Sequence, residues 1–145
     1  MLSEDGAGRE RRRAMDGVME FGGREAFRKW LSENCRSSGG VWLLFGKAGG
    51  PETVKAEEAL EEALCFGWID GQMRSIDERT YKKYFSLRRE RSKWSERNKA
   101  LAGSLEERGL MTDFGREKIE EAKRNGQWYA PKPAAAAEEQ IARLS

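Results

Sequence analysis

Histidine is absent from this sequence of 145 residues. The absence excludes catalytic triads and general bases that use histidine, and it excludes metal sites with histidine ligands. The two cysteines, Cys35 and Cys65, are too few for a structural zinc site and match no CxxC pattern. The chain is highly charged and begins without the apolar stretch of a signal peptide, so we expect a cytoplasmic location. Both thiols should then be free and buried.

Long apolar runs are missing too. The longest, residues 41–45, has the length of a strand, whereas a membrane-spanning helix needs about 20 apolar residues. We therefore expect no membrane span. The 27 Lys and Arg against 25 Asp and Glu give a net charge of only +2, so contact with nucleic acid would depend on a local patch.

What the chain does contain is enough aromatic and periodic apolar sequence for one folded domain. Its 5 Trp, 6 Phe and 3 Tyr are more than a disordered chain carries. The patterns and turn signals predict, in order, a helix around 24–36, a strand at 41–45, a helix at 53–64, a hairpin at 65–76 and 81–87, a helix capped by Ser92 or Ser95, and a helix capped by Thr112.

This order predicts an α+β fold: a small antiparallel sheet, made of a strand plus a β-hairpin, packed with about four helices in a single domain. We expect the domain to span residues 21–129. Residues 1–20 should form a flexible N-terminal tail and residues 130–145 a C-terminal tail.

Two stretches carry opposite charge. Residues 52–62 hold five Glu and one Lys, a net charge of −4, and residues 82–99 hold eight Lys or Arg and two Glu, a net charge of +6. We interpret Glu57, Glu58, Glu61 and Glu62 as a solvated helix face and not as a metal cluster, because carboxylates that point to water lack the enclosure of a cation site. The two stretches could neutralise each other's fields.

Asp70 is the most unusual acid, since it lies among aromatic residues and glycines at 66–71. One interpretation is structural: the carboxylate binds backbone amides or pairs with Arg88 or Arg89. A second is a cleft for an anionic or peptide-like ligand, gripped by guanidinium groups and walled by tryptophan. A third is an enzyme with Asp70 as general base, although no second catalytic group of distinctive type or spacing accompanies it. An enzyme is thus the less favoured possibility, and we assign no catalytic residue, no metal ligand and no cofactor.

A separate hypothesis uses the basic, aromatic segment 81–99 to bind nucleic acid. Tyr81, Tyr84, Phe85 and Trp94 are interleaved there with the positive charges, a combination suited to stacking on unpaired bases. The same aromatic residues also alternate as a half-buried strand would require. Nucleic acid is therefore the alternative partner, behind a small anionic ligand or a protein.

The longest informative segment resembles a known family. Residues 61–71, with the sequence EEALCFGWIDG, are similar to the signature of the bacterial YdeI/OmpD-associated family, also labelled bacteriocin-protection proteins. The resemblance continues through YFSLRRERSKWS at 84–95, and spans about 21–128 in all. Ser86 and Leu87 replace the family's threonine and proline, and Glu90 replaces a frequent proline, so this loop should be less rigid here.

The resemblance implies a role in bacterial stress or bacteriocin protection, and it supplies no agreed catalytic residues and no cofactor. It also implies that matching residues surround one pocket, where the hairpin meets the following helix. Together with the pattern above, the candidate ligand-binding residues are Trp68, Asp70, Gln72, Arg88, Arg89, Ser92, Trp94, Ser95 and Asn98.

Overall fold

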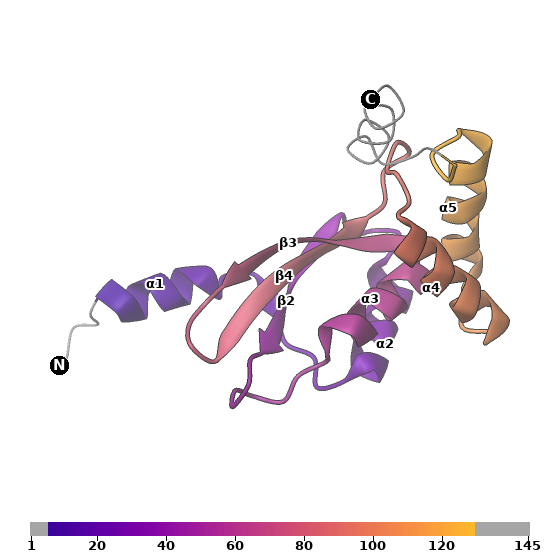
Figure 1. Cartoon of the computed structure of the whole chain (residues 1–145). Helices are drawn as coiled ribbons and strands as arrows, with labels where there is room; N and C mark the ends of the chain where they lie inside the picture. The colour runs from indigo at the N-terminus through magenta and orange to yellow at the C-terminus, as the bar shows by residue number, and fades with distance from the viewer. Residues whose placement is uncertain (1–5, 130–145) are drawn as a thin grey trace, which may run out of the picture.

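The computed structural model describes residues 6–129, and the predicted C-terminal tail lies outside this range. Figure 1 shows a sheet with helices packed below it and at one end. The elements in chain order are α1 (Gly6–Ala14), β1 (Val18–Met19), α2 (Arg24–Asn34), β2 (Gly40–Gly46), α3 (Ala56–Cys65), β3 (Trp68–Ser75), β4 (Thr80–Leu87), α4 (Glu96–Glu107) and α5 (Asp113–Arg124).

The sheet has four strands in the order β1-β2-β4-β3. The predicted strand and hairpin are present as β2, β3 and β4, and these three pair in antiparallel fashion. The sheet as a whole is mixed, because β1 pairs with β2 in parallel. This strand and α1 lie within the segment that we expected to be a flexible tail. The α+β single-domain fold is confirmed, with five helices in the described part instead of about four.

One face of the sheet packs on α2 and α3 (Figure 1). Leu43, Phe45 and Phe85 point to this face and are buried, and the ring of Phe85 meets the ring of Phe27 from α2 at a centroid distance of 5.6 Å. In β4, Phe85 lies between partly exposed residues, as expected for a strand with one covered face, whereas in β2 Leu44 on the opposite face is buried as well. The core therefore lies between the sheet and the α2–α3 layer.

The helix caps agree in two places with the sequence and differ in one. The side chains of Ser95 and Thr112 accept backbone N–H groups at the starts of α4 and α5, as predicted. Thr53 does not cap α3, which begins after Lys55. The hydroxyl of Thr53 accepts instead from the backbone N–H of Gly46, because the chain folds back beside the end of β2.

The acidic face of α3 is solvated only in part: Glu57 is exposed, but the prediction was wrong for Glu62. Glu62 is only 3% exposed and accepts hydrogen bonds from Arg24 and Arg28 of α2. Glu61 also pairs with Arg24, at 2.7 Å. The hydrogen bonds that Arg24 donates to Glu61 and Glu62 raise the pKa of Arg24. Among the described residues, the basic groups that pair with α3 are Arg24 and Arg28 of α2 and Arg108 after α4, and none of them comes from residues 82–99.

Cys35 and Cys65 are both free and buried, as predicted, and burial raises the pKa of each thiol. Among residues 6–129, no helix is long and apolar enough to cross a membrane. Within the same range, no group of three or more Cys, Asp or Glu side chains is arranged to hold a metal ion.

Candidate functional site

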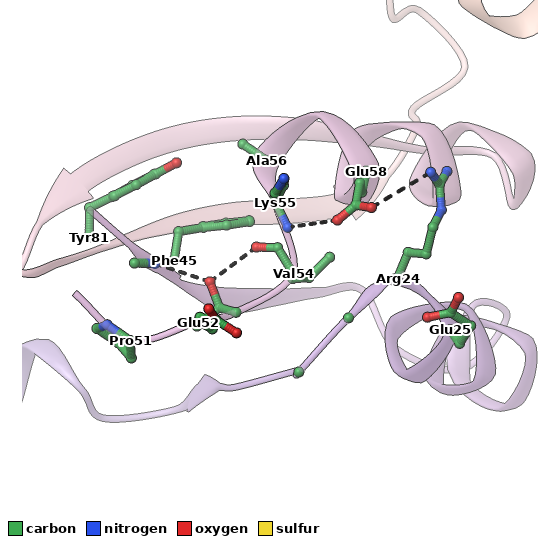
Figure 2. A pocket seen from close by; sticks show the side chains of 14 residues that line it. Arg24, Glu25, Phe45, Pro51, Glu52, Val54, Lys55, Ala56, Glu58 and Tyr81 are labelled. Atoms are coloured by element: carbon green, nitrogen blue, oxygen red, sulfur yellow. Dashed lines mark hydrogen bonds and ion pairs between the residues drawn. The ribbon is translucent and has the colours of Figure 1, made fainter. Parts of the chain in front are cut away.

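A surface cleft of about 690 Å³ opens where the chain enters α2 and α3. Figure 2 shows the loop before α3, the start of α2 and the rings of Phe45 and Tyr81 around it. The two rings stack at a centroid distance of 5.2 Å. Phe45 is only 1% exposed, so the aromatic surface of the cleft comes from Tyr81, which is partly exposed.

Two charged groups of this cleft, Glu58 and Arg24, already have partners in the chain. Glu58 accepts from the backbone N–H of Lys55, and its other oxygen faces Arg24 at 3.9 Å (Figure 2). Arg24 is in turn held by Glu61 and Glu62. The buried atoms that lack a partner among the described residues lie outside this cleft.

Arg88, just after the end of β4, is different. Arg88 is only 4% exposed, and its Cζ lies 3.7 Å from the centroid of the Trp94 ring. Nε and Nη2 are buried and have no hydrogen-bond partner among the described residues. Burial lowers the pKa of Arg88 to about 10, and the nearby charge of Asp70 opposes this shift. The side chain therefore remains charged at neutral pH.

The two atoms of Arg88 without partners form one recognition edge. Nε and Nη2 are the pair of donors with which a guanidinium grips both oxygens of a carboxylate or phosphate. Arg116 shows this arrangement in the same molecule: its Nε and Nη2 donate to the two oxygens of Glu106 at 2.6 and 2.8 Å, and these hydrogen bonds lower the pKa of Glu106. At Arg88 the equivalent edge meets no carboxylate of the described chain.

Asp70 does not supply that carboxylate. Its Oδ2 lies 2.7 Å from Nζ of Lys83, and both side chains are about one quarter exposed. The ion pair is therefore with Lys83 and not with Arg88 or Arg89, the two partners considered in the structural interpretation. Asp70 still acts on Arg88 through its charge.

The remaining sequence candidates do not gather around Arg88 in one pocket. Trp68 is fully buried, and its indole N–H donates to the carbonyl of Cys35. Ser92 accepts the backbone N–H of Arg89, and Ser95 accepts that of Asn98. Gln72 and Arg89 are exposed, the former on the edge strand β3. Among these candidates, Arg88 and Trp94 form a contact between two side chains, whereas Ser92 and Ser95 bind backbone groups.

Two further residues matter here that the sequence did not single out. Lys83 holds Asp70, and the ring of Trp128 packs against Trp94 at a centroid distance of 4.9 Å. The alternation of β4 could have indicated Lys83, because it lies two residues before Phe85 and so on the same face. No local pattern indicates Trp128, which follows α5 and lies 34 positions after Trp94.

A family model described as a domain of unknown function (DUF8412) matches residues 19–118, from β1 into α5. Comparison with curated proteins gave no match, and comparison with solved structures gave none. The match covers Arg88, Trp94 and Asp70, and it ends before Trp128.

Proposed function

The chain belongs to the DUF8412 family of domains of unknown function, and we propose that it is a binding domain without catalytic activity, in which Arg88 anchors an oxyanion of a small ligand. The observation that carries the proposal is the buried Nε and Nη2 edge of Arg88, which has no partner among the described residues. The ligand group is a carboxylate or a phosphate, because these match the edge with two parallel hydrogen bonds.

The energetics favour an anion at this position. A buried donor without a partner costs about 1–3 kcal/mol, and more when it is charged. An oxyanion on the Arg88 edge would remove this cost for two donors at once. The flat Trp94 ring at 3.7 Å holds the guanidinium plane in one orientation, so little freedom remains to be lost on binding.

We propose that a ligand reaches Arg88 past the segment that joins β4 to α4. This segment has no regular secondary structure, and it is tied down by the hydrogen bond of Arg89 with Ser92 and by one from Asn125 to the carbonyl of Glu90. A ligand would enter when these few contacts open, since loops with sparse contacts open at low cost.

The proposal is tested by adding inorganic phosphate or acetate at constant ionic strength, with chloride as reference, and measuring Tm. An anion that binds the folded state raises Tm. We expect a larger rise with one or both oxyanions than with chloride. The Arg88→Lys variant keeps the charge and loses the two-donor edge, so it should lose the excess.

The matched control is Arg89→Lys, the same substitution at the exposed neighbouring position, which should keep the full excess. The arginine Nε–H signals in NMR spectra of the unmodified protein give a second readout that does not depend on a variant. An equal Tm rise in all three proteins, with no Nε–H signal displaced by either oxyanion, would contradict the proposal.

The other functions expected from the sequence receive less support. For an enzyme centred on Asp70, the carboxylate is held by Lys83 and no distinctive second group accompanies it among the described residues. For nucleic acid on the segment 81–99, Tyr81 lines the cleft while Arg88 and Trp94 are buried, so fewer of its side chains are available than the sequence suggested. The YdeI/OmpD-associated resemblance implies a role in bacterial stress or bacteriocin protection in the cytoplasm. This role stays a prediction.

A further inference from the structure

The face of the sheet opposite α2 and α3 carries a second set of side chains suited to binding. The strand register places Trp42 beside Tyr84, and Lys82 beside Arg74. These residues alternate with the buried Leu43 and Phe85, so they point away from the core. Trp42, Tyr84 and Lys82 are partly exposed and Arg74 is exposed. Figure 1 shows α2 and α3 on the other side of these strands.

The two aromatic rings, whose planes are tilted by 54°, form one apolar surface, which we call the platform. Trp42 and Tyr84 are direct neighbours across β2 and β4, with ring centroids 5.2 Å apart. The Tyr84 ring also extends over Gly40, where a Cβ atom would collide with the tyrosine hydroxyl. Tyr84 therefore lies along the sheet surface instead of standing up from it, and the glycine is needed for this position.

Positive charge lies directly beside the platform. Nζ of Lys82 is 4.6 Å from the centroid of the Trp42 ring and donates to the carbonyl of Ala14 at the end of α1. Arg74 contacts the amide oxygen of Gln72. Neither cation forms an ion pair with a carboxylate within residues 6–129. Helix α1, which extends past the strand ends (Figure 1), contains the exposed Arg9 and Arg13.

We infer that this sheet face, defined by Trp42, Arg74, Lys82 and Tyr84, binds single-stranded nucleic acid. Rings that lie on a sheet stack on unpaired bases, and adjacent unpaired cations contact the phosphates. A double helix keeps its bases stacked inside and would use only the cations. The inference does not depend on the oxyanion site, because Arg88 lies beyond the end of β4 and is buried in the core.

The test measures the binding of fluorescently labelled oligo(dT) and oligo(rU), each about 12 nucleotides long, by anisotropy over a salt series. The Arg74→Gln/Lys82→Gln variant should bind at least tenfold more weakly. If both cations contact phosphates, the slope of log affinity against log salt should fall by about 1.4, at roughly 0.7 for each phosphate in a single strand.

Stacking is tested separately by Tyr84→Leu and Trp42→Leu, which keep apolar bulk but remove the ring. Each should weaken binding at least fivefold with little change in the salt slope, because no charge is lost. Circular dichroism and Tm verify that these variants fold. If one of the ring variants does not fold, the cation variant still decides the question.

The matched control is Arg97→Gln, which removes an exposed cation from α4, away from this face. It should bind like the unmodified protein, and so should Arg88→Lys, which separates this inference from the oxyanion site. The inference is overturned if no oligonucleotide binds at about 50 mM salt, if a duplex of the same length binds as tightly as the single strand, or if only anionic lipid vesicles bind.

Discussion

At the residue scale, the buried guanidinium of Arg88 lowers the stability of the protein at the same position where it would hold an anion. The Arg88→Met variant keeps an unbranched side chain against Trp94 and removes two buried donors without partners. We expect the free energy of unfolding to rise by about 1–3 kcal/mol, because the lost cation–π contact is worth less than the removed penalty. Urea denaturation at neutral pH measures this, and a less stable variant would contradict it.

The difference in unfolding free energy between Arg88→Met and the unmodified protein should depend on pH. This dependence follows from the pKa of Arg88, which burial lowers to about 10. Its pKa is higher in the unfolded chain, so the unfolded state holds the proton more tightly. The penalty is therefore fully present below about pH 10 and decreases as the pH rises from there towards the ordinary arginine value. The difference in unfolding free energy between the variant and the unmodified protein should be constant from pH 6 to 9 and shrink above about 10.

Asp70 gives the second prediction at this scale. Its charge acts on Arg88 without a hydrogen bond, and it is paired with Lys83 at 2.7 Å. Asp70→Asn removes a negative charge near the oxyanion site, so phosphate or acetate should bind about 2- to 10-fold more tightly. Stability should change by about 0–1 kcal/mol, because the pair is partly exposed. Weaker anion binding would mean that Asp70 contacts the ligand directly, as the sequence analysis allowed.

The chemistry of this site could be predicted from the sequence, but its geometry could not. The combination of Arg88 with Trp94 followed from residue types at close spacing. The burial of Arg88 depends on tertiary packing at the end of the sheet, where Trp94 meets Trp128, and this packing leaves no local pattern. The partner of Asp70 was misjudged because the pairing of the strands was not known. Asp70 lies opposite Phe85, and Lys83, two residues before Phe85, reaches the carboxylate directly. Arg88 interacts with Asp70 only through its charge.

At the element scale, Glu62 joins α3 to α2. It is buried and binds both Arg24 and Arg28. Glu62→Gln should lower the free energy of unfolding by about 3 kcal/mol, because two guanidinium groups lose their buried anionic partner. Glu57→Gln, an exposed position of the same helix, should change it by less than about 0.5 kcal/mol. Equal effects in thermal denaturation would show that the α3 carboxylates are solvated, as the sequence suggested.

Two helix glycines provide an opposed pair of predictions. Gly115 lies in the first turn of α5, where a Cβ would collide with the carbonyl oxygen of Cys65, the backbone atom that Thr112 also binds. Gly115→Ala should therefore destabilise the protein by at least about 2 kcal/mol. Gly103 lies in α4 with open space around it, so Gly103→Ala should stabilise by about 0.5–1 kcal/mol. Chemical denaturation of both variants checks the pair, and loss of stability in Gly103→Ala would contradict it.

Element prediction succeeded where the signal was local. Ser95 and Thr112 cap their helices because each hydroxyl lies next to the N–H groups that it accepts. Thr53 failed as a cap because a distant strand residue, Gly46, uses its hydroxyl. The strand β1 has two residues and therefore no periodicity, so its parallel pairing with β2 could not be predicted.

At the scale of the whole molecule, the oxyanion site lies between two parts of the fold. One part is the sheet with α2 and α3, and the other is the α4–α5 pair, which packs on α3 beyond the end of the sheet (Figure 1). Thr112 and Arg28 connect the two parts by hydrogen bonds to the backbone of Cys65 and Leu110. Arg88, from the sheet side, meets Trp94 at the start of the second part. An anion held by Arg88 should therefore tighten this contact.

Hydrogen exchange followed by mass spectrometry tests this last prediction. Without ligand, β2 and β4 should exchange slowest, because both lie between two paired strands. Saturating phosphate should slow exchange mainly in residues 89–95 and at the start of α4, since opening of this segment exposes Arg88. The chloride reference and the Arg88→Lys variant should not show this protection. Protection spread evenly over the chain, or protection retained in Arg88→Lys, would mean that the anion binds elsewhere and that Arg88 has a structural role only.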